Sequence, residues 1–194
     1  MKTKPRILVL RGGAIGDFIL TLPAIRALRR RWPDAHLEII GYPHIADLAL
    51  ADGFVDCVIS LDKAEMARFF SPNPAIPEAQ AETIRSFDLI VSYLYDPDET
   101  VRRNLLSVGA RQVVYRSPKV EQVHAVDHLF KALEELAIYP EGVEYPVLEL
   151  KADHRGKGRE RIARFGRDVV ALHPGSGSPR RTGRWIVLWS WRND

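Results

Sequence analysis

The sequence contains very little cysteine and no long apolar run. Cys57 is the single cysteine among 194 residues, which excludes an intramolecular disulfide framework and fits a reducing compartment. No apolar run approaches the roughly 18–20 residues that are needed to cross a bilayer. The first such run, Ile7 to Leu10, ends at Arg11, whereas a secretory signal needs about 7–15 apolar residues. We therefore expect a mature N-terminus and a cytoplasmic protein.

Composition and charge narrow the class of protein further. A hydrophobic content of 46% excludes a disordered or collagen-like chain. Residues 1–150 hold 17 Lys and Arg against 21 Asp and Glu, a net charge of −4, whereas residues 151–194 hold 11 against 4, a net charge of +7. A basic C-terminal segment can bind nucleic acid or a membrane surface, but it is also typical of a solvated helix near a binding site for an anionic small molecule. Because stacking aromatics are not interleaved with these charges, we expect no nucleic-acid partner.

Apolar runs rich in β-formers alternate with segments of helical periodicity. The pattern predicts strands at residues 6–10, 36–40, 55–60, 88–94, 112–115 and 168–172, and helices at 17–31, 45–51, 78–87, 98–108, 124–138 and 153–166. This alternation predicts a Rossmann-like, doubly wound parallel α/β sheet in residues 1–150. Residues 151–194 then read as a basic linker helix and the start of an incomplete second unit, with a glycine-rich loop at 173–179.

A glycine-rich loop joins the first predicted strand to the first helix. Its sequence, residues 11–17, is Arg-Gly-Gly-Ala-Ile-Gly-Asp. Glycines let the backbone turn tightly and leave the helix N-terminus open, where N–H groups and the helix dipole favour an anion. Asp17 stands where an N-cap is expected.

A dinucleotide site is one interpretation of this loop. The fingerprint Gly-x-Gly-x-x-Gly would place Gly13 and Gly16 correctly, but its first position is then Arg11. The acidic ribose partner about 20 residues further on would be Glu38, which lies inside the second predicted strand rather than at its end. A nucleotide-dependent oxidoreductase is therefore a disfavoured alternative.

Three segments resemble a known family. Residues 7–28, which include Gly-Asp followed by Thr-Leu-Pro-Ala, look like the N-terminus of glycosyltransferase family 9, the ADP-heptose:lipopolysaccharide heptosyltransferases. Residues 123–128, Val-His-Ala-Val-Asp-His, are similar to the family's His-x-Val-Asp segment. Residues 171–178 look like the strand and loop that open its nucleotide-sugar domain. The matches occur in the family's order and span residues 6 to about 181.

The resemblance implies a two-domain GT-B transferase. In that architecture the acceptor binds the N-terminal domain and the ADP-activated donor binds the C-terminal one, with no essential metal and no cofactor beside the donor. The implied acceptor is the lipopolysaccharide inner core, at the cytoplasmic face of the membrane, where peripheral contact is expected. Asp17 matches the family's catalytic aspartate, so the resemblance implies that it is the general base.

The resemblance also implies acceptor-binding residues. Gly12, Gly13 and Gly16 would shape the loop, and Arg11 would face the anionic acceptor or simply close the strand at the surface. His124 and Asp127 are three residues apart and share one helical face, which suits either a substrate role or the start of that helix.

The resemblance implies that the donor phosphates bind at the glycine-rich loop 173–179 and the residues that follow it. Ser176, Gly177 and Ser178 offer hydroxyl and N–H groups for them. Arg180 and Arg181 follow, and Arg181 stands where the family has a lysine that meets the donor diphosphate. An arginine still binds phosphate, and does so in a bidentate way.

The family pattern stops after Arg181. There the family continues Lys-Asn-Trp-Pro-Leu, whereas residues 182–185 are Thr-Gly-Arg-Trp. A set of codons for Asn-Trp-Pro-Leu encodes Thr-Gly-Arg-Trp when the reading frame is shifted by one base. We therefore expect a truncated or frameshifted family member with little or no transferase activity. A natural short protein, whose apolar tail meets a partner or membrane, is the alternative. A non-catalytic acceptor-binding module that retains the N-terminal fold is the competing function.

Overall fold

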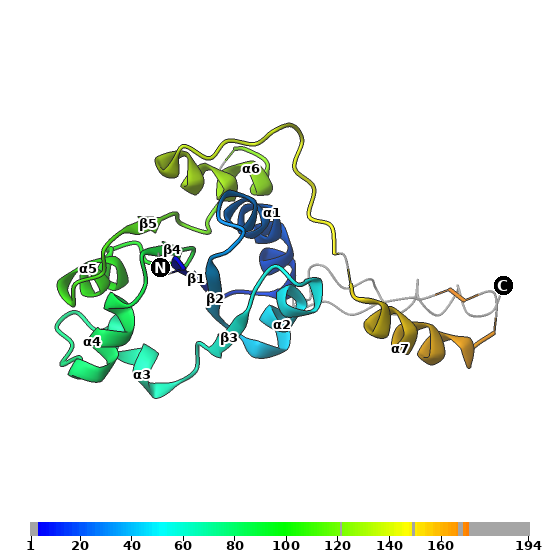
Figure 1. Cartoon of the computed structure of the whole chain (residues 1–194), viewed down its shortest axis with the longest axis horizontal. Helices are drawn as coiled ribbons and strands as arrows, with labels where there is room; N and C mark the ends of the chain where they lie inside the picture. Colours follow the sequence, from blue (N-terminus) through cyan, green and yellow to red (C-terminus); the bar gives the residue numbers. More distant parts are fainter. Residues whose placement is uncertain (1–3, 121, 149, 167–168, 171–194) are drawn as a thin grey trace, which may run out of the picture. The chain divides into compact units, whose positions relative to one another are not determined.

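The chain divides into two units, residues 1–151 and 152–194. The structure, a computed structural model, describes residues 4–120, 122–148, 150–166, 169 and 170. The first unit contains all five strands of the described chain, and the second contains one described helix (Figure 1). The functional geometry therefore comes from the first unit.

One five-stranded parallel sheet forms the middle layer of the first unit. Its spatial order is β3-β2-β1-β4-β5. The strands are β1 (Arg6–Arg11), β2 (His36–Gly41), β3 (Cys57–Ser60), β4 (Leu89–Ser92) and β5 (Val113–Tyr115). In register, Val9 of β1 lies opposite Ile39 of β2 and Val91 of β4. The predicted Rossmann-like, doubly wound α/β sheet is thus confirmed.

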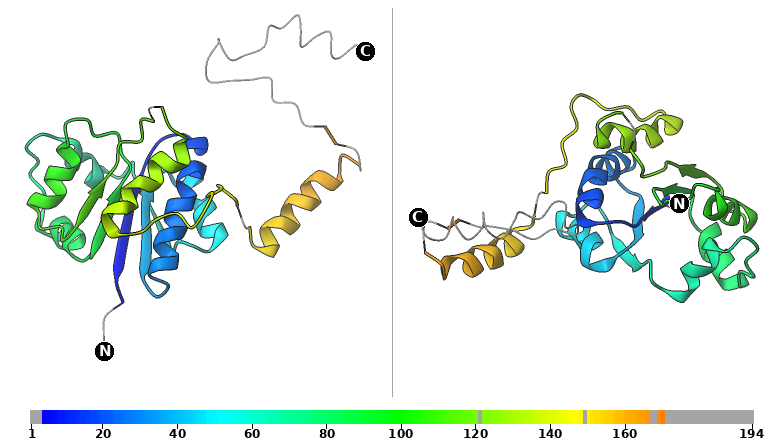
Figure 2. Two further views of the ribbon diagram at one scale, coloured as in Figure 1. Left: turned by 90° about the horizontal axis from the view of Figure 1, so that it is seen from above. Right: turned by 180° about the vertical axis from the view of Figure 1, so that it is seen from behind.

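Helices cover both faces of this sheet (Figure 2). One face packs on α1 (Ile15–Arg31), α2 (Pro43–Asp52), α6 (Ala125–Phe130) and the 3-10 helix η2 (Lys131–Leu136). The other face packs on α3 (Ala64–Ala67), the 3-10 helix η1 (Arg68–Phe70), α4 (Glu78–Arg85) and α5 (Thr100–Ser107). The central strand β1 is therefore buried on both sides, which explains its unbroken apolar sequence.

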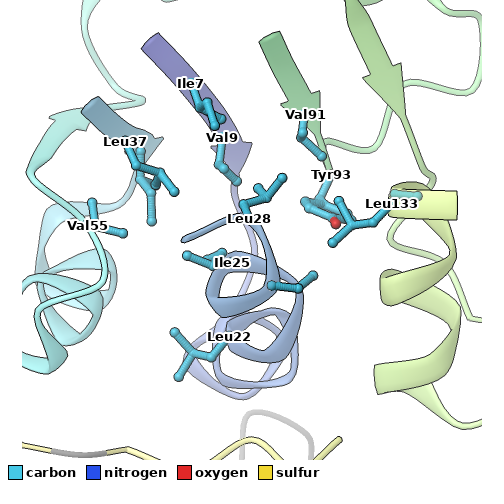
Figure 3. Close-up of a cluster of buried hydrophobic side chains, with 14 of the residues drawn as sticks. Ile7, Val9, Leu22, Ile25, Leu28, Leu37, Val55, Val91, Tyr93 and Leu133 are labelled. Atoms are coloured by element: carbon cyan, nitrogen blue, oxygen red, sulfur yellow. The ribbon is translucent and has the colours of Figure 1, made fainter. Parts of the chain in front are cut away.

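Alternation along β1 divides the core into two clusters. Ile7 and Val9 face α1, whereas Leu8 and Leu10 face the opposite helices. On the α1 side, Leu22, Ile25 and Leu28 belong to one buried cluster, and Figure 3 shows Leu28 between the helix and the strands. Phe18 belongs to the same cluster, so the buried residues follow at intervals of four, three and three, and one stripe of α1 lies against the sheet.

Helix α1 begins earlier than the sequence predicts. The helix starts at Ile15 with Ala14 as its N-cap, so the prediction that Asp17 is the N-cap is wrong. Gly13 has φ +93°, and this left-handed turn brings the chain into the helix before Asp17 is reached. Asp17 instead occupies the third helical position, from which an acidic side chain can reach back to the N-cap amide.

The predicted helix at 124–138 is also modified. It divides into α6 and the tighter η2, and Ala137 ends it with φ +53°. The apolar spacing predicts an inward face of Val126, Leu129, Leu133 and Leu136. The first three are buried, and Leu136 is half-buried. The short segment α3–η1 is not predicted from the sequence, since seven residues are too few to display a helical period.

The second unit is described over α7 (Ala152–Ala163) and a few following residues. No residue of α7 is buried, in keeping with its basic, solvated composition. Val169 and Val170 carry no strand, and the other residues of the strand predicted at 168–172 lie outside the described residues. The predicted second Rossmann-like unit, with its loop at 173–179, also lies outside them.

Packing of α1 against the sheet should dominate stability. Leu28 is 0% exposed between α1 and the strands, whereas Leu106 in α5 is 44% exposed. We expect Leu28→Ala to lower the free energy of unfolding by about 2–5 kcal/mol, because it removes buried methyl groups and leaves a cavity. The matched variant Leu106→Ala should change it by about 0.5 kcal/mol. Urea unfolding of the full chain measures both values, and equal losses would contradict this view of the core.

Candidate active site

A hollow of about 450 Å³ lies at the carboxyl edge of the sheet, beside the ends of β1 and β4. Its lining residues are Arg11, Gly12, Gly13, Asp17, Tyr93, Leu94, Tyr95, Pro118 and Lys119. They follow β1, β4 and β5, which are neighbours in the sheet. The hollow is thus built from segments far apart in the sequence.

Sheet topology explains this position. After β1 the chain passes to β2 and β3 on one side, and it later crosses to β4 and β5 on the other. The connections that leave β1 and β4 therefore diverge, and a crevice opens outside the strand ends. Such a crevice is the usual ligand site of an open parallel α/β sheet.

Gly13 shapes the loop that carries the acidic group. Its φ of +93° is a conformation that side-chain-bearing residues rarely adopt. A Cβ atom at Gly13 would also lie 3.2 Å from the Asp17 Oδ2 atom. The glycine therefore provides both the turn and the room for the Asp17 carboxylate.

Asp17 is an exposed carboxylate in the first turn of α1. Its Oδ2 atom accepts a hydrogen bond from the Ala14 N–H over 3.2 Å. No other hydrogen bond to this carboxylate occurs within the described part of the chain. An acceptor oxygen is thus available at the hollow, next to helix N–H groups that favour negative charge.

Arg11 stands below the hollow and is only 4% exposed. Its guanidinium donates hydrogen bonds to the Thr21 hydroxyl (2.9 Å), the Asp17 carbonyl (2.9 Å) and the Tyr93 carbonyl (3.3 Å). Burial lowers the pKa of Arg11 from its ordinary value, while nearby Asp17 opposes that shift. The side chain is therefore bound into the scaffold as well as lining the hollow.

A second hollow, of about 540 Å³, shares Lys119 with the first. Its described lining residues are Tyr115, Arg116, Ser117, Lys119, Val123, His128 and Lys131. Three of these are permanently basic and none is acidic. A hollow with this lining attracts an anion such as a carboxylate or phosphate.

Arg116 is held in this second hollow by a histidine. The His128 Nε2 atom lies 2.8 Å from the Ser117 carbonyl, so it donates the hydrogen bond. In the neutral ring, Nδ1 is then an acceptor, and the Arg116 Nη2 atom lies 3.4 Å from it. The Arg116 Nε atom is buried, and among the described residues it has no hydrogen-bond partner.

Tyr93 lines the first hollow and is near the guanidinium groups of Arg11 and Arg116. Its ring is buried in the core (Figure 3), and its hydroxyl has no hydrogen-bond partner among the described residues. Burial raises the pKa of Tyr93 well above its ordinary value, although Arg11 and Arg116 act in the opposite direction. The phenol therefore stays neutral between two guanidinium groups.

The structure brings together some of the sequence-predicted residues. Arg11, Gly12, Gly13 and Asp17 line the first hollow. Gly16 lies within α1, where a Cβ would meet nothing within 4 Å.

The structure leaves the other predicted site residues apart from this group. His124 and Asp127 are exposed at the start of α6 and line neither hollow. The predicted donor-phosphate residues lie outside the described residues: Ser176, Gly177, Ser178, Arg180 and Arg181.

Among the site residues that the sequence analysis missed are an exposed tyrosine and two basic residues. Tyr95 is 65% exposed and lines the first hollow, Arg116 lines the second, and Lys119 lines both. Each of them follows soon after a predicted strand. Because the carboxyl ends of parallel strands meet at one edge, that position is the signal that would have found them.

Glu38 is placed where it cannot serve a nucleotide at this edge. Its side chain is nearly buried within β2, and its Oε1 atom accepts a hydrogen bond from Arg6 Nη2 over 2.5 Å. It also lies 3.2 Å from His36 Nε2, at the start of the strand. The fingerprint interpretation thus lacks its ribose partner.

The described ranges contain neither a metal-binding cluster nor a membrane-spanning helix. Those residues contain no group of three or more His, Cys, Asp and Glu gathered around a common point. None of the helices described has the length and apolarity needed to span a membrane.

Comparison with known proteins identifies the fold. A scan against protein-family models and a search of curated proteins both return no match. Among solved structures, the chain is similar to a glycosyltransferase family 9 protein from Veillonella parvula DSM 2008, with a TM-score of 0.66 and 19% identity, over 92% of this chain and 56% of that one. It is also similar to E. coli ADP-heptose lps heptosyltransferase II, with a TM-score of 0.55 and 12% identity, over 81% and 50% of the two chains. The chain thus shares their fold and spans about half of their length.

The two loop glycines should respond differently to substitution. We expect Gly13→Ala to destabilise the full chain by about 1–2 kcal/mol, because it places a Cβ in left-handed backbone against Asp17. Gly16→Ala is the matched control, and it should be neutral or stabilising by up to about 1 kcal/mol, because Gly16 is helical and unhindered. Thermal or urea unfolding measures both changes. Equal effects of the two variants would contradict the role given to Gly13.

Proposed function

We propose that this chain belongs to a glycosyltransferase that transfers a heptose or related sugar from an ADP-activated donor to a lipopolysaccharide core acceptor. Because the family pattern stops after Arg181, we expect the 194-residue chain by itself to have little of this activity. The first unit would bind the acceptor, and Asp17 would be the general base. The observation that carries the proposal is the exposed Asp17 carboxylate in a hollow at the strand-order reversal. The shared fold with glycosyltransferase family 9 and heptosyltransferase II structures supports it.

Asp17 suits the chemistry that sugar transfer requires. An acceptor hydroxyl must lose its proton as its oxygen attacks the donor sugar, and a carboxylate within hydrogen-bond distance can take that proton. The Ala14 N–H holds one carboxylate oxygen, which fixes the group in the first turn of α1. The second oxygen is left to accept the substrate proton.

The basic second hollow suits an anionic acceptor. Arg116, Lys119 and Lys131 surround it, and Lys119 also reaches the hollow that contains Asp17. An acceptor sugar with a carboxylate or phosphate would place that anion in the second hollow and its hydroxyl beside Asp17. We assign to these residues the contact with the anionic acceptor, which was one of the two alternatives for Arg11, because the Arg11 guanidinium is engaged by the protein.

Tyr95 completes the acceptor side. Its exposed ring lines the first hollow. An aromatic ring packs against the C–H face of a sugar while leaving the sugar hydroxyl groups free for hydrogen bonds. We assign the donor phosphates, as the sequence does, to Ser176, Gly177, Ser178, Arg180 and Arg181.

A non-catalytic acceptor-binding module is the second candidate function. Both hollows lie within residues 11–131, inside a single unit, so acceptor binding does not require residues 152–194. Binding of an acidic sugar without consumption of an ADP-sugar would favour this module over the transferase.

Asp17 provides the direct test of the transferase. We expect Asp17→Asn to lower the turnover number about 10²–10⁴-fold, because the amide cannot accept the proton. The free energy of unfolding should change by only about 0.5 kcal/mol, because the asparagine Oδ1 atom can still accept a hydrogen bond from the Ala14 N–H. Release of ADP from an ADP-sugar, in the presence of a lipopolysaccharide core acceptor, measures turnover. Glu78→Gln, in the first turn of α4, is the control and should keep full activity.

The basic hollow has its own test. We expect the double variant Arg116→Gln/Lys131→Gln to weaken binding of an acidic acceptor about 100-fold or more, because each of the two lost charge-assisted contacts is worth about 1.5–3 kcal/mol. Titration calorimetry with an acidic core oligosaccharide measures the dissociation constant, and high salt should reduce the difference. The exposed Arg103→Gln serves as the control. Unchanged affinity in the double variant would exclude this hollow as the anion site.

A further inference from the structure

Arg11 has an unexpected position for a buried arginine. It lies beside the N-terminus of α1, where the helix dipole disfavours a cation. Its 4% exposure also removes it from water, which costs free energy unless the charge is compensated. A side chain that opposes both effects is retained for a specific purpose.

The contacts of Arg11 indicate that purpose. The flat guanidinium joins three points: the Thr21 hydroxyl, the Asp17 carbonyl and the carbonyl of Tyr93 after β4. The Thr21 hydroxyl in turn donates to the same Asp17 carbonyl over 2.8 Å. The first turn of α1 is therefore attached to the end of β4 through the residue that bears the carboxylate.

We infer that Arg11 is a positioning residue, which fixes the Asp17 carboxylate by holding the Asp17 backbone against the neighbouring strand end, and that it does not bind substrate. The inference rests on the proposed function of Asp17 for its catalytic meaning. Thr21 is the second member of this device, because its hydroxyl accepts from Arg11 and donates to Asp17. A lysine cannot replace Arg11, since a single ammonium lacks the planar fork that reaches three acceptors.

The Ala14 amide proton reports the carboxylate position without any need for activity. The Ala14 N–H donates to the Asp17 Oδ2 atom, so its chemical shift depends on where that oxygen lies. In the ¹⁵N-labelled full chain, the wild type and Asp17→Ala define the two ends of the scale, because an alanine side chain offers the Ala14 N–H no acceptor. We expect Arg11→Lys to move the Ala14 resonance at least halfway toward the Asp17→Ala value. Thr21→Val, which changes no charge, should move it in the same direction.

Arg103→Lys is the matched control, because Arg103 is an exposed arginine on α5 with one hydrogen bond to Thr100. It should leave the Ala14 resonance unchanged. If Arg11 only stabilised the fold, Arg11→Lys would lower the unfolding temperature without moving the Ala14 resonance of the folded chain. An unmoved resonance in both Arg11→Lys and Thr21→Val would overturn the inference.

Kinetics separate positioning from substrate binding. In the ADP-release assay with a core acceptor, positioning predicts that Arg11→Lys lowers kcat at least tenfold with little change in KM for the acceptor. A rise in KM with unchanged kcat would instead make Arg11 a substrate ligand and overturn the inference. The Ala14 resonance decides whether Arg11 positions the carboxylate even if the wild-type chain releases no ADP, which is the low activity expected of a chain that departs from the family pattern after Arg181.

Discussion

The structure depends on one constraint, the burial of β1 on both faces at the centre of a parallel sheet. Because helices cover both sides of β1, its side chains are apolar from Ile7 to Leu10. The strand has neighbours on both edges, so the chain must leave it in one direction and return on the other. Polar groups are then concentrated at the strand ends, where the two halves of the chain diverge.

The backbone carbonyls gathered at these strand ends need hydrogen-bond donors, and Arg11 provides them. The end of β1, the first turn of α1 and the end of β4 bring backbone carbonyls together below the hollow. A guanidinium with several donors satisfies carbonyls from two of these segments and a hydroxyl from α1. Its own charge is balanced in part by the Asp17 carboxylate. The hydrogen bonds of Arg11 therefore hold the scaffold together and also fix the position of Asp17.

Sequence patterns predicted the sheet well, because strands buried on both faces leave a strong apolar signal. They located α1 and the inward face of α6 from apolar spacing alone. They misplaced the N-cap of α1, because the left-handed turn at Gly13 depends on tertiary space around Asp17. The basic hollow was not predicted, since Arg116 and Lys131 are 15 positions apart and meet only because η2 returns beside the end of β5. Contacts of this kind arise from topology and leave no local period.

The same topology separates binding from chemistry. Both hollows belong to the first unit, and their lining residues come from its strand ends and from the segment between β5 and η2. An acceptor held there meets one carboxylate, which can remove a proton but cannot activate a sugar. Departure of a diphosphate needs positive charge or N–H groups from another part of the protein. In the proposed reaction the first unit therefore decides which hydroxyl attacks, and the donor-binding residues decide whether the attacked bond breaks.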